Sequence, residues 1–325
     1  MLGPDFSNFD PENLPPNVSI ASRGLIVMFF TFGIALGTLA GRLYCRFVKT
    51  QKPGWDDATI TLATICALLE LSFKTTFIYY GEGRHVLYLN SYQIEQAYKY
   101  SQLVLYPFIF STAITKISVG FMVLRFSQTR AMRYSMYALM ASLIVVNGAC
   151  IVVLLSFCRP IYATWDIRVK HAVCLSSKIL SLASGIQGLW SVVTDLICTS
   201  LPLVIVWKLH MGREQKIAVT VLVSFGLVTT GCSIGRCIYY ATTKFPPDQT
   251  WSGIDLAVWT SLESNIGIFA ANLPALGAML NLKSIIVRCK WLSGPEKYPD
   301  FPAYDHIGTS LDSQTASAKR TVQVN

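Results

Sequence analysis

Six ionisable side chains stand inside long apolar stretches of this sequence, where they could bind a ligand or switch a conformation. They are three acids and three bases: Glu70, Lys74, Lys116, Asp195, Arg236 and Glu263. If the stretches cross a bilayer, a charge near the centre costs about 3 kcal/mol, so such groups usually pair or line a functional pathway. The six formal charges sum to zero, which means that the set can neutralise itself.

The positions of these charges along their segments place them in two layers, at a helical rise of about 1.5 Å per residue. The outer layer provides the candidates for a ligand pocket: Glu70, Lys74, Arg236 and Glu263. The inner layer provides an inner charge cluster: Asp56, Asp57, Lys116 and Asp195. We expect the first layer to bind a ligand and the second to act as a switch. The alternative for both is a polar clamp that only holds helices together.

A hinge is predicted near the cytosolic end of the last apolar segment, at Asn272 and Pro274. A proline inside a membrane helix frees a backbone carbonyl, and a nearby asparagine side chain can satisfy it. We expect ligand binding to move this hinge together with the inner charge cluster.

The apolar segments that carry these residues are long enough to cross a bilayer. Hydrophobic residues make up 52% of the 325-residue chain and charged residues 14%, against about 25% charged in a typical soluble domain. Four runs of 18 to 25 residues carry no charge, and a crossing needs about 20 mostly apolar residues. Isolated charges interrupt three further segments.

The sequence therefore predicts an all-α bundle of seven transmembrane helices within residues 21–283. The expected spans are 21–46, 56–80, 96–126, 132–157, 178–208, 215–243 and 251–282. A short extracellular tail, 1–20, precedes the bundle, and a largely disordered cytosolic tail, 284–325, follows it.

The distribution of basic residues predicts the orientation. The loops after the first, third, fifth and seventh segments carry 14 Lys and Arg residues, and the opposite side carries 8. The positive-inside rule then places the N-terminus outside and the C-terminus in the cytosol. This placement of the net charge of +9 argues against nucleic-acid binding. We expect a multi-pass protein of the plasma membrane, with a glycosylation sequon at Asn17 on the outer side.

Two of the nine cysteines, Cys158 and Cys174, flank the loop between the fourth and fifth segments. Because the predicted outer side is oxidising, we expect them to form a disulfide that fixes this loop over the bundle. The alternative is a pair of free thiols.

The chain shows no arrangement typical of a catalytic, metal or cofactor site. Its four histidines fall in loops, at a segment end or in the tail, whereas a metal hydrolase needs several ligands at fixed helical spacing. The last segment contains no lysine, which excludes a retinal Schiff base in the usual seventh helix. The motif Gly81-Glu82-Gly83-Arg84-His85 falls in a loop and lacks the strand and helix of a phosphate-binding loop. The sequence therefore favours a protein without enzymatic activity, metal or cofactor.

Several motifs, taken in order along residues 24–280, resemble the fungal rhodopsin-domain integral membrane proteins. They are Gly54-Trp55-Asp56-Asp57, Tyr80-Gly81-Glu82-Gly83-Arg84-His85, Thr115-Lys116-Ile117-Ser118, Leu124-Arg125, Cys158-Arg159-Pro160, Trp165, Cys174, Asp195, Leu201-Pro202, Trp207-Lys208-Leu209, Ser233, Arg236, Glu263 and Leu273-Pro274. The resemblance implies a seven-helix fold similar to rhodopsin and to G-protein-coupled receptors, without retinal. The family includes receptor-like proteins and proteins encoded in secondary-metabolite gene clusters.

These observations predict a receptor-like membrane protein that senses an extracellular small molecule. Its partners would be the lipid bilayer, that unknown ligand and a cytosolic signalling protein. One alternative is a membrane enzyme or accessory protein of a fungal secondary-metabolite pathway. Another alternative is a small-molecule transporter.

Overall fold

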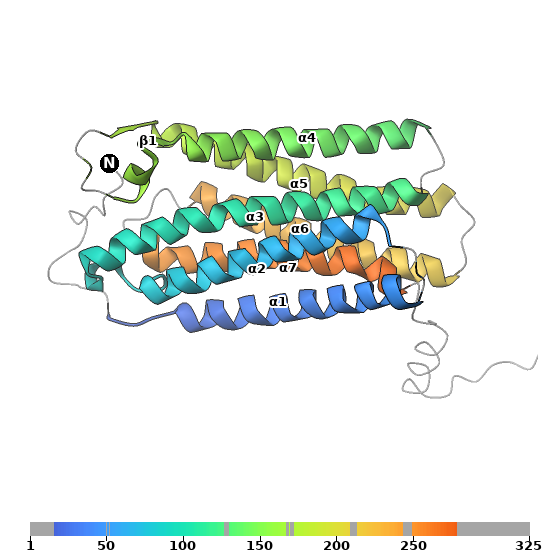
Figure 1. Ribbon diagram of the computed structural model, residues 1–325, viewed down its shortest axis with the longest axis horizontal. Helices are drawn as coiled ribbons and strands as arrows, with labels where there is room; N and C mark the ends of the chain where they lie inside the picture. The colour runs from blue at the N-terminus through green and yellow to red at the C-terminus, as the bar shows by residue number, and fades with distance from the viewer. Residues whose placement is uncertain are drawn as a thin grey trace, which may run out of the picture. The chain divides into compact units, whose positions relative to one another are not determined.

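The computed structural model describes residues 16–277, except 50, 52, 127–129, 167–168, 170–171, 209–212 and 243–248. These residues belong to one compact unit, 1–282, whereas the predicted cytosolic tail, 284–325, lies outside the described residues. The described part contains seven long helices (Figure 1): α1 (Ala21–Tyr44), α2 (Trp55–Tyr80), α3 (Ser91–Phe126), α4 (Arg130–Leu155), α5 (Ser177–Lys208), α6 (Arg213–Thr242) and α7 (Gln249–Gly277). The all-α, seven-helix architecture predicted from the sequence is confirmed.

Short elements join these helices. A π-helical turn, η2 (Cys45–Lys49), continues α1, and a 3-10 turn, η3 (Val86–Tyr88), lies between α2 and α3. Between α4 and α5, β1 (Cys158–Arg159) pairs antiparallel with β2 (Val173–Cys174), and η4 (Ile161–Thr164) lies between the two strands.

Cys158 and Cys174 face each other across this strand pair and form a disulfide. The disulfide predicted from the sequence is therefore confirmed. The bond joins residues separated by 16 positions, and closing a loop of that length stabilises a fold by about 3 kcal/mol in the chain-entropy account.

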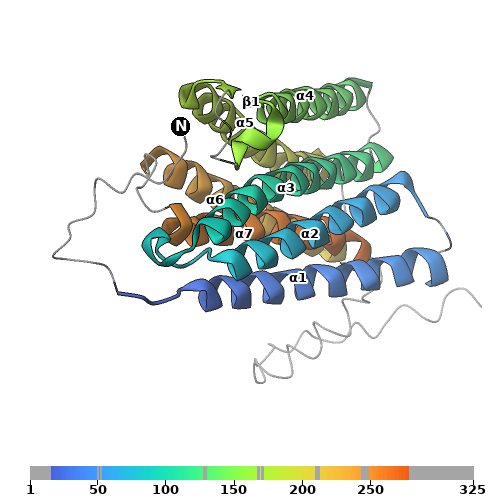
Figure 2. The same cartoon turned by 60° about the vertical axis from the view of Figure 1, so that its left-hand side comes forward.

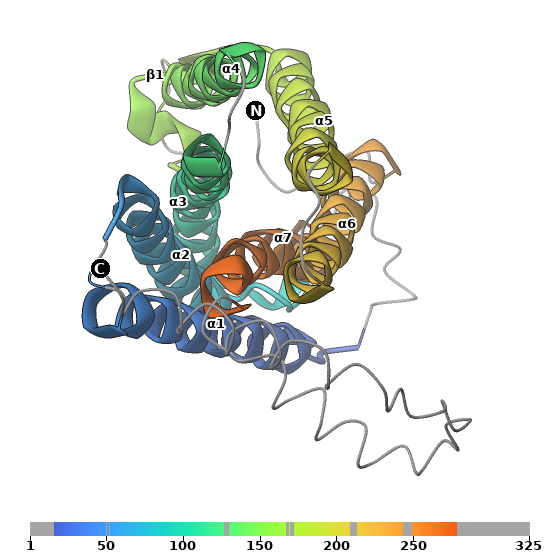
Figure 3. The same cartoon turned by 90° about the vertical axis from the view of Figure 1, so that its right-hand side faces the viewer.

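The helices lie side by side, and consecutive helices run in opposite directions (Figures 1 and 2). Viewed end on, they follow one another around the bundle from α1 to α7, and α7 returns beside α1 (Figure 3). An apolar core cluster joins α1, α2 and α7 through residues such as Met28, Ile60 and Ile268. We call the end that carries β1 and β2 the disulfide end, and the end where α2 begins the Asp56 end.

Within the described residues, five helices, α1 to α5, are long and apolar enough to cross a membrane. Large apolar side chains stand exposed on their outer faces, such as Phe30 on α1 and Val145 on α4, each 68% exposed. Extended apolar surfaces of this kind mark a membrane or an interface, because soluble monomers rarely expose them. The orientation in the membrane stays a prediction. Asn17 is exposed just before α1, and its glycosylation stays a prediction as well.

Candidate functional site

Two buried ion pairs lie in the core of the bundle. Arg236 of α6 holds Glu263 of α7 through two nitrogens, with Nε donating to Oε2 at 2.7 Å and Nη2 to Oε1 at 3.2 Å. Lys116 of α3 pairs with Asp195 of α5 at 3.0 Å. All four side chains are buried. Each pair is neutral, which is the usual way in which charges are retained inside a membrane protein.

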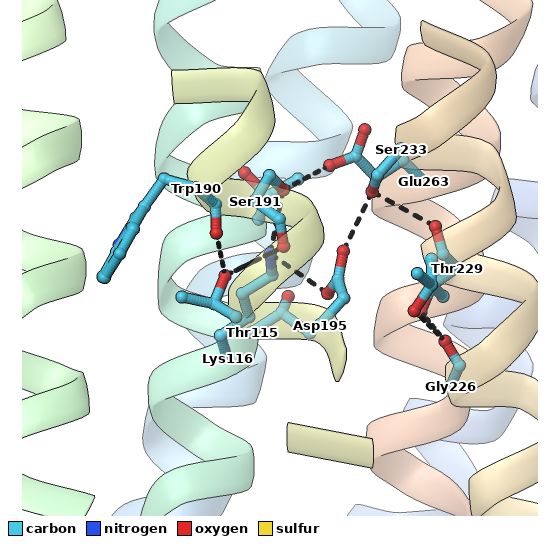
Figure 4. Close-up of polar contacts among 12 residues, drawn as sticks. Thr115, Lys116, Trp190, Ser191, Asp195, Gly226, Thr229, Ser233 and Glu263 are labelled. Atoms are coloured by element: carbon cyan, nitrogen blue, oxygen red, sulfur yellow. Dashed lines mark hydrogen bonds and ion pairs between the residues drawn. The ribbon is translucent and has the colours of Figure 1, made fainter. Parts of the chain in front are cut away.

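Ser191 of α5 links the two pairs (Figure 4). Its Oγ donates to Glu263 Oε1 at 2.8 Å and accepts from Lys116 Nζ at 2.8 Å. On the opposite side, Ser233 of α6 donates to Asp195 Oδ2 at 2.9 Å. These bonds connect α3, α5, α6 and α7. We call this set of side chains the core network: Lys116, Ser191, Asp195, Ser233, Arg236 and Glu263.

A cavity lies beside the core network, between α3, α5, α6 and α7. Lys116, Asp195 and Glu263 line it, together with small and hydroxyl-bearing residues such as Thr115 and Gly267. About 60 Å³ is open to the centres of water-sized molecules, and one water needs roughly 10–15 Å³ on this measure. The cavity is therefore large enough for about four waters or a ligand of a few heavy atoms, well below the ~300 Å³ of a typical ligand pocket.

Arg236 extends the core network to further groups. Its Nη1 donates to Gln187 Oε1 on α5 at 3.3 Å, and Gln187 Nε2 in turn donates to Asn147 Oδ1 on α4 at 3.4 Å. The guanidinium carbon lies 5.2 Å from the ring centroid of Phe108 on α3, which is within the range of a cation–π contact. A change at the Arg236–Glu263 pair would therefore alter contacts with α3, α4, α5 and α7.

At the Asp56 end, Asp56 and Asp57 pair with a cation of α1 and not with Lys116. Arg42 Nη2 lies 2.7 Å from Asp56 Oδ2, and Arg42 Nε lies 2.8 Å from Asp57 Oδ1. Arg46 lies farther away, 3.5 Å from Asp56 and 3.7 Å from Asp57. The inner charge cluster expected from the sequence is thus divided in two, because Arg42 on the neighbouring helix reaches both carboxylates at the same level.

Near the disulfide end, Lys74 of α2 pairs with Glu82, a residue of the turn that follows α2. Lys74 Nζ lies 3.7 Å from Glu82 Oε1, and both side chains and that of Glu70 are buried. Burial raises the pKa of Glu82 to about 7, while Lys74 acts in the opposite direction. The expected outer layer is therefore divided as well, since Arg236 and Glu263 belong to the core network.

The segment of α7 that holds the predicted hinge contacts α1. Arg42 Nη1 donates to the carbonyl of Ala271 at 2.8 Å, and Asn272 Nδ2 donates to Thr38 Oγ1 at 3.4 Å. Pro274 lies inside α7, three residues after Ala271. Arg42 thus joins the two α2 carboxylates to the α7 backbone just before the proline. Movement at this hinge stays a prediction.

Arg42 and Ser191 were not among the candidate residues expected from the sequence, whereas Glu82 and Ser233 appeared in the family motifs but were given no role at a site. Serines inside helices commonly bond to their own backbone, as Ser72 does to the carbonyl of Leu68 at 2.8 Å, so a serine's place in a helix does not show whether it bonds to a charged group. Arg42 ends the first charge-free run and was counted with the basic residues that follow it, although it lies inside the expected span 21–46. For Glu82 a signal existed, because it is an acid between two glycines.

Comparison with known proteins provides three distant relatives. Fugralins biosynthesis cluster protein 2 of Gibberella zeae is 28% identical over 158 residues, which are 48% of this chain and 38% of the relative. An SAT4 family membrane protein of Emericella nidulans is 27% identical over 233 residues, 70% of this chain and 54% of the relative. Polyenoic acids biosynthesis gene cluster protein Ba17b of Metarhizium anisopliae is 22% identical over 250 residues, 72% and 66% respectively. The chain thus spans less than two thirds of each relative.

A family model described as the fungal rhodopsin domain matches residues 41–282. The match includes every residue of the core network and both of the other charged clusters. It covers well over half of the chain and confirms the resemblance seen in the sequence motifs. The protein is therefore a membrane protein that belongs to the fungal rhodopsin domain family.

Proposed function

We propose that this protein is a receptor-like sensor in which a small molecule, bound without retinal, rearranges the core network. The observation that carries the proposal is the cavity lined by Lys116, Asp195 and Glu263. The charges that would meet a ligand there are the same charges that connect four helices. A ligand in this position would therefore act directly on the helix packing.

The lining of the cavity indicates the chemical class of the ligand. A small carboxylate would compete with Asp195 for Lys116, and a small amine would compete with Lys116 for Asp195. Removing one partner of a buried ion pair costs about 3–5 kcal/mol when nothing replaces it. Binding would thus be coupled to rearrangement, because the displaced partner must find a new group.

The proposed orientation places the disulfide end outside the cell. The disulfide between Cys158 and Cys174 supports it, because such bonds persist in oxidising compartments. The Asp56 end would then face the cytosol, and movement of α7 there could be read by a signalling protein. The proposed location is the plasma membrane.

A role in a biosynthetic pathway is the second candidate. Two relatives carry names that place them in biosynthesis clusters, for fugralins and for polyenoic acids. In that case the bundle would act on a pathway intermediate or assist the enzymes that do. The cavity would then hold a reacting group and not a signal.

A panel of small carboxylic acids and amines separates these candidates. The purified full chain in lipid nanodiscs is incubated with each compound, and its unfolding midpoint is measured together with the distance between spin labels on α2 and α7. For a sensor we expect some compounds to raise the midpoint and change the distance while being recovered unaltered. Recovery of a chemically converted compound would support the pathway role.

Two variants show whether the cavity is the binding site. Arg236→Gln combined with Glu263→Gln removes both charges of this ion pair, so that neither is left buried without its partner, and it should abolish both responses. Asp255→Asn alters an exposed acid of the same helix and should keep them. Equal responses in the wild type and the double variant would contradict the proposal that the ligand binds in this cavity.

A further inference from the structure

The turn after α2 directs an acidic side chain into the bundle. Gly81 and Gly83 have φ angles of 127° and 87°, in the region where only glycine is free of strain. The glycines reverse the chain so that Glu82 between them is buried, with 1% of its surface exposed. This explains a glycine-rich motif that the core network leaves without a role.

The buried carboxyl of Glu82 lacks adequate partners. Among the residues that the structure describes, neither Oε1 nor Oε2 has a hydrogen-bond partner, and Lys74 Nζ at 3.7 Å is beyond hydrogen-bond distance. The backbone of α7 closes the other side, since a Cβ placed on Gly253 would lie 3.4 Å from Oε1. An ionised carboxylate in such a place carries a large desolvation cost, so the neutral form is favoured.

The neighbouring charges leave an excess of negative charge. Glu70 lies one helical turn from Lys74, and its Oε1 also lacks a hydrogen-bond partner within the described part of the chain. Two carboxylates and one ammonium carry a net charge of −1, which a single proton neutralises. Lys74 repels a metal cation from the same space, so the proton is the cation that the cluster can accept.

Other ionisable groups on the packed elements lie nearer to the surface. Arg23 on α1, Arg84 in the turn and Asp255 on α7 are exposed, whereas Glu95 and Lys99 on α3 are half-buried. The half-buried His85 stacks on Trp251 of α7, with ring centroids 4.0 Å apart. Glu263 lies near Glu70 but is already held by Arg236.

The turn that carries Glu82 also joins three helices. Ile20 N, before α1, donates to the carbonyl of Gly83 at 3.1 Å, and Gly83 N donates to the carbonyl of Thr250 on α7 at 2.8 Å. Thr250 Oγ1 donates in return to the carbonyl of Arg84 at 2.8 Å. A change in the state of Glu82 therefore reaches α1, α2 and α7 through backbone bonds.

We propose that Glu82 is a proton-binding site at the disulfide end, which takes up a proton from the aqueous phase and thereby tightens the junction of α1, α2 and α7. The cluster of Glu70, Lys74 and Glu82 and the glycine turn together form the site. The pKa of Glu82, raised by burial to about 7, agrees with this geometry. The site is separate from the core network and does not depend on the proposed receptor role.

Proton uptake by Glu82 changes the stability of the fold with pH in a defined direction. The folded-state pKa of about 7 lies above the ordinary value of 4.5, so the folded protein binds this proton more tightly than the unfolded chain. The stability that Glu82 contributes is complete below about pH 4.5 and is lost as the pH rises to about 7.

The test compares the full chain in nanodiscs with Glu82→Gln, which imitates the protonated carboxyl. Between about pH 5 and about pH 8 the unfolding midpoint of the wild type should fall relative to that of Glu82→Gln. Asp255→Asn is the matched control and should follow the wild type. In infrared difference spectra, the wild type should lose a protonated-carboxyl band over the same range, and Glu82→Gln should lack that band. Parallel pH profiles of the wild type and Glu82→Gln would overturn the proposal.

A second variant keeps the test decisive if Glu82→Gln fails to fold. Lys74→Gln removes the cation that lowers the pKa of Glu82, so the infrared band should persist to higher pH than in the wild type. A band that disappears at an unchanged pH, or a wild type with no such band near neutral pH, would count against a proton held by this cluster.

Discussion

At the start of α2, Asp56 and Asp57 face Arg42 at 2.7 and 2.8 Å, whereas just past its end Glu82 faces Lys74 at 3.7 Å. Burial is similar at both places, because all of these residues are at most 6% exposed. The two places differ in how many partners each carboxylate has. Asp57 Oδ2 also accepts a hydrogen bond from the Gly54 N–H at 3.0 Å, while no described residue offers a hydrogen bond to either oxygen of Glu82.

The difference separates a clamp from a site that can change state. Fully paired buried charges hold one arrangement, since losing any partner leaves an uncompensated charge. A carboxylate with few partners gains little interaction energy from its charge, so it can change its protonation state near neutral pH. The Asp56 end is thus suited to fix α1, α2 and α7 together, and the Glu82 end is suited to respond.

Loss of Arg42 should have the largest effect. Arg42→Met keeps the bulk of the side chain but removes the donors to Asp56, Asp57 and the Ala271 carbonyl. We expect the free energy of unfolding to fall by about 3–5 kcal/mol, as for other buried pairs broken on one side. Unfolding by a denaturing detergent, followed by circular dichroism, measures this free energy.

Arg46→Met is the matched control for this loss, because Arg46 lies 3.5 Å or more from the same carboxylates and its side chain is 16% exposed. Its removal should cost less than about 1 kcal/mol. Equal losses in the two variants would show that Arg42 is not the principal partner.

Neutralising one acid at each end tests the comparison directly. Asp57→Asn weakens the bond to Arg42 at 2.8 Å, and we expect a loss of about 1.5–3 kcal/mol, typical of a hydrogen bond to a charged group. Glu82→Gln at about pH 8 should leave the stability unchanged or raise it, because a buried, underpaired carboxylate is replaced by a neutral amide. A large loss in both variants would remove the distinction between the ends.

The turn at the Glu82 end gives a third, smaller effect. Gly83 has a φ of 87°, and the Cβ that Gly83→Ala adds would lie 2.9 Å from the backbone nitrogen of Ala21. We therefore expect the free energy of unfolding to fall by about 1–3 kcal/mol. The added Cβ of Gly148→Ala on α4 meets none of the described residues within 4 Å, and this variant should not lose stability, since alanine favours a helix more than glycine. Thermal unfolding in nanodiscs compares the two, and an equally stable Gly83→Ala would mean that the turn is not constrained.

The fold could be predicted from the sequence because apolar runs of membrane length are unmistakable. The charges inside those runs were visible for the same reason. The partners of these charges could not be predicted. The sequence indicates how deep a side chain lies along its helix, but its contacts also depend on the rotation of the helix about its axis and on which helix packs beside it. Glu263 and Lys116 thus fell in different layers, yet both bond to Ser191.

Arg42 illustrates the converse difficulty. The expected span 21–46 already included Arg42, but a charge at the end of an apolar run looks like a membrane boundary, and the sequence does not show that its side chain is turned inward, 1% exposed. Only the packing of α1 against α2 and α7 reveals it. Glu82 was hidden by its position in a loop, although its two flanking glycines already indicated an unusual backbone.

The smallest effect should come from the coupling between Lys74 and Glu82. A double-mutant cycle with Lys74→Gln and Glu82→Gln should give a coupling energy below about 1 kcal/mol at pH 6, where Glu82 is mostly protonated and offers no charge to the lysine. At about pH 8 the carboxylate is ionised and the coupling should grow. The corresponding cycle of Arg42→Met and Asp57→Asn should be larger and the same at both pH values. If the Lys74–Glu82 coupling were equally strong at both pH values, Glu82 would be a permanent ion-pair partner, and the two ends of α2 would both be clamps.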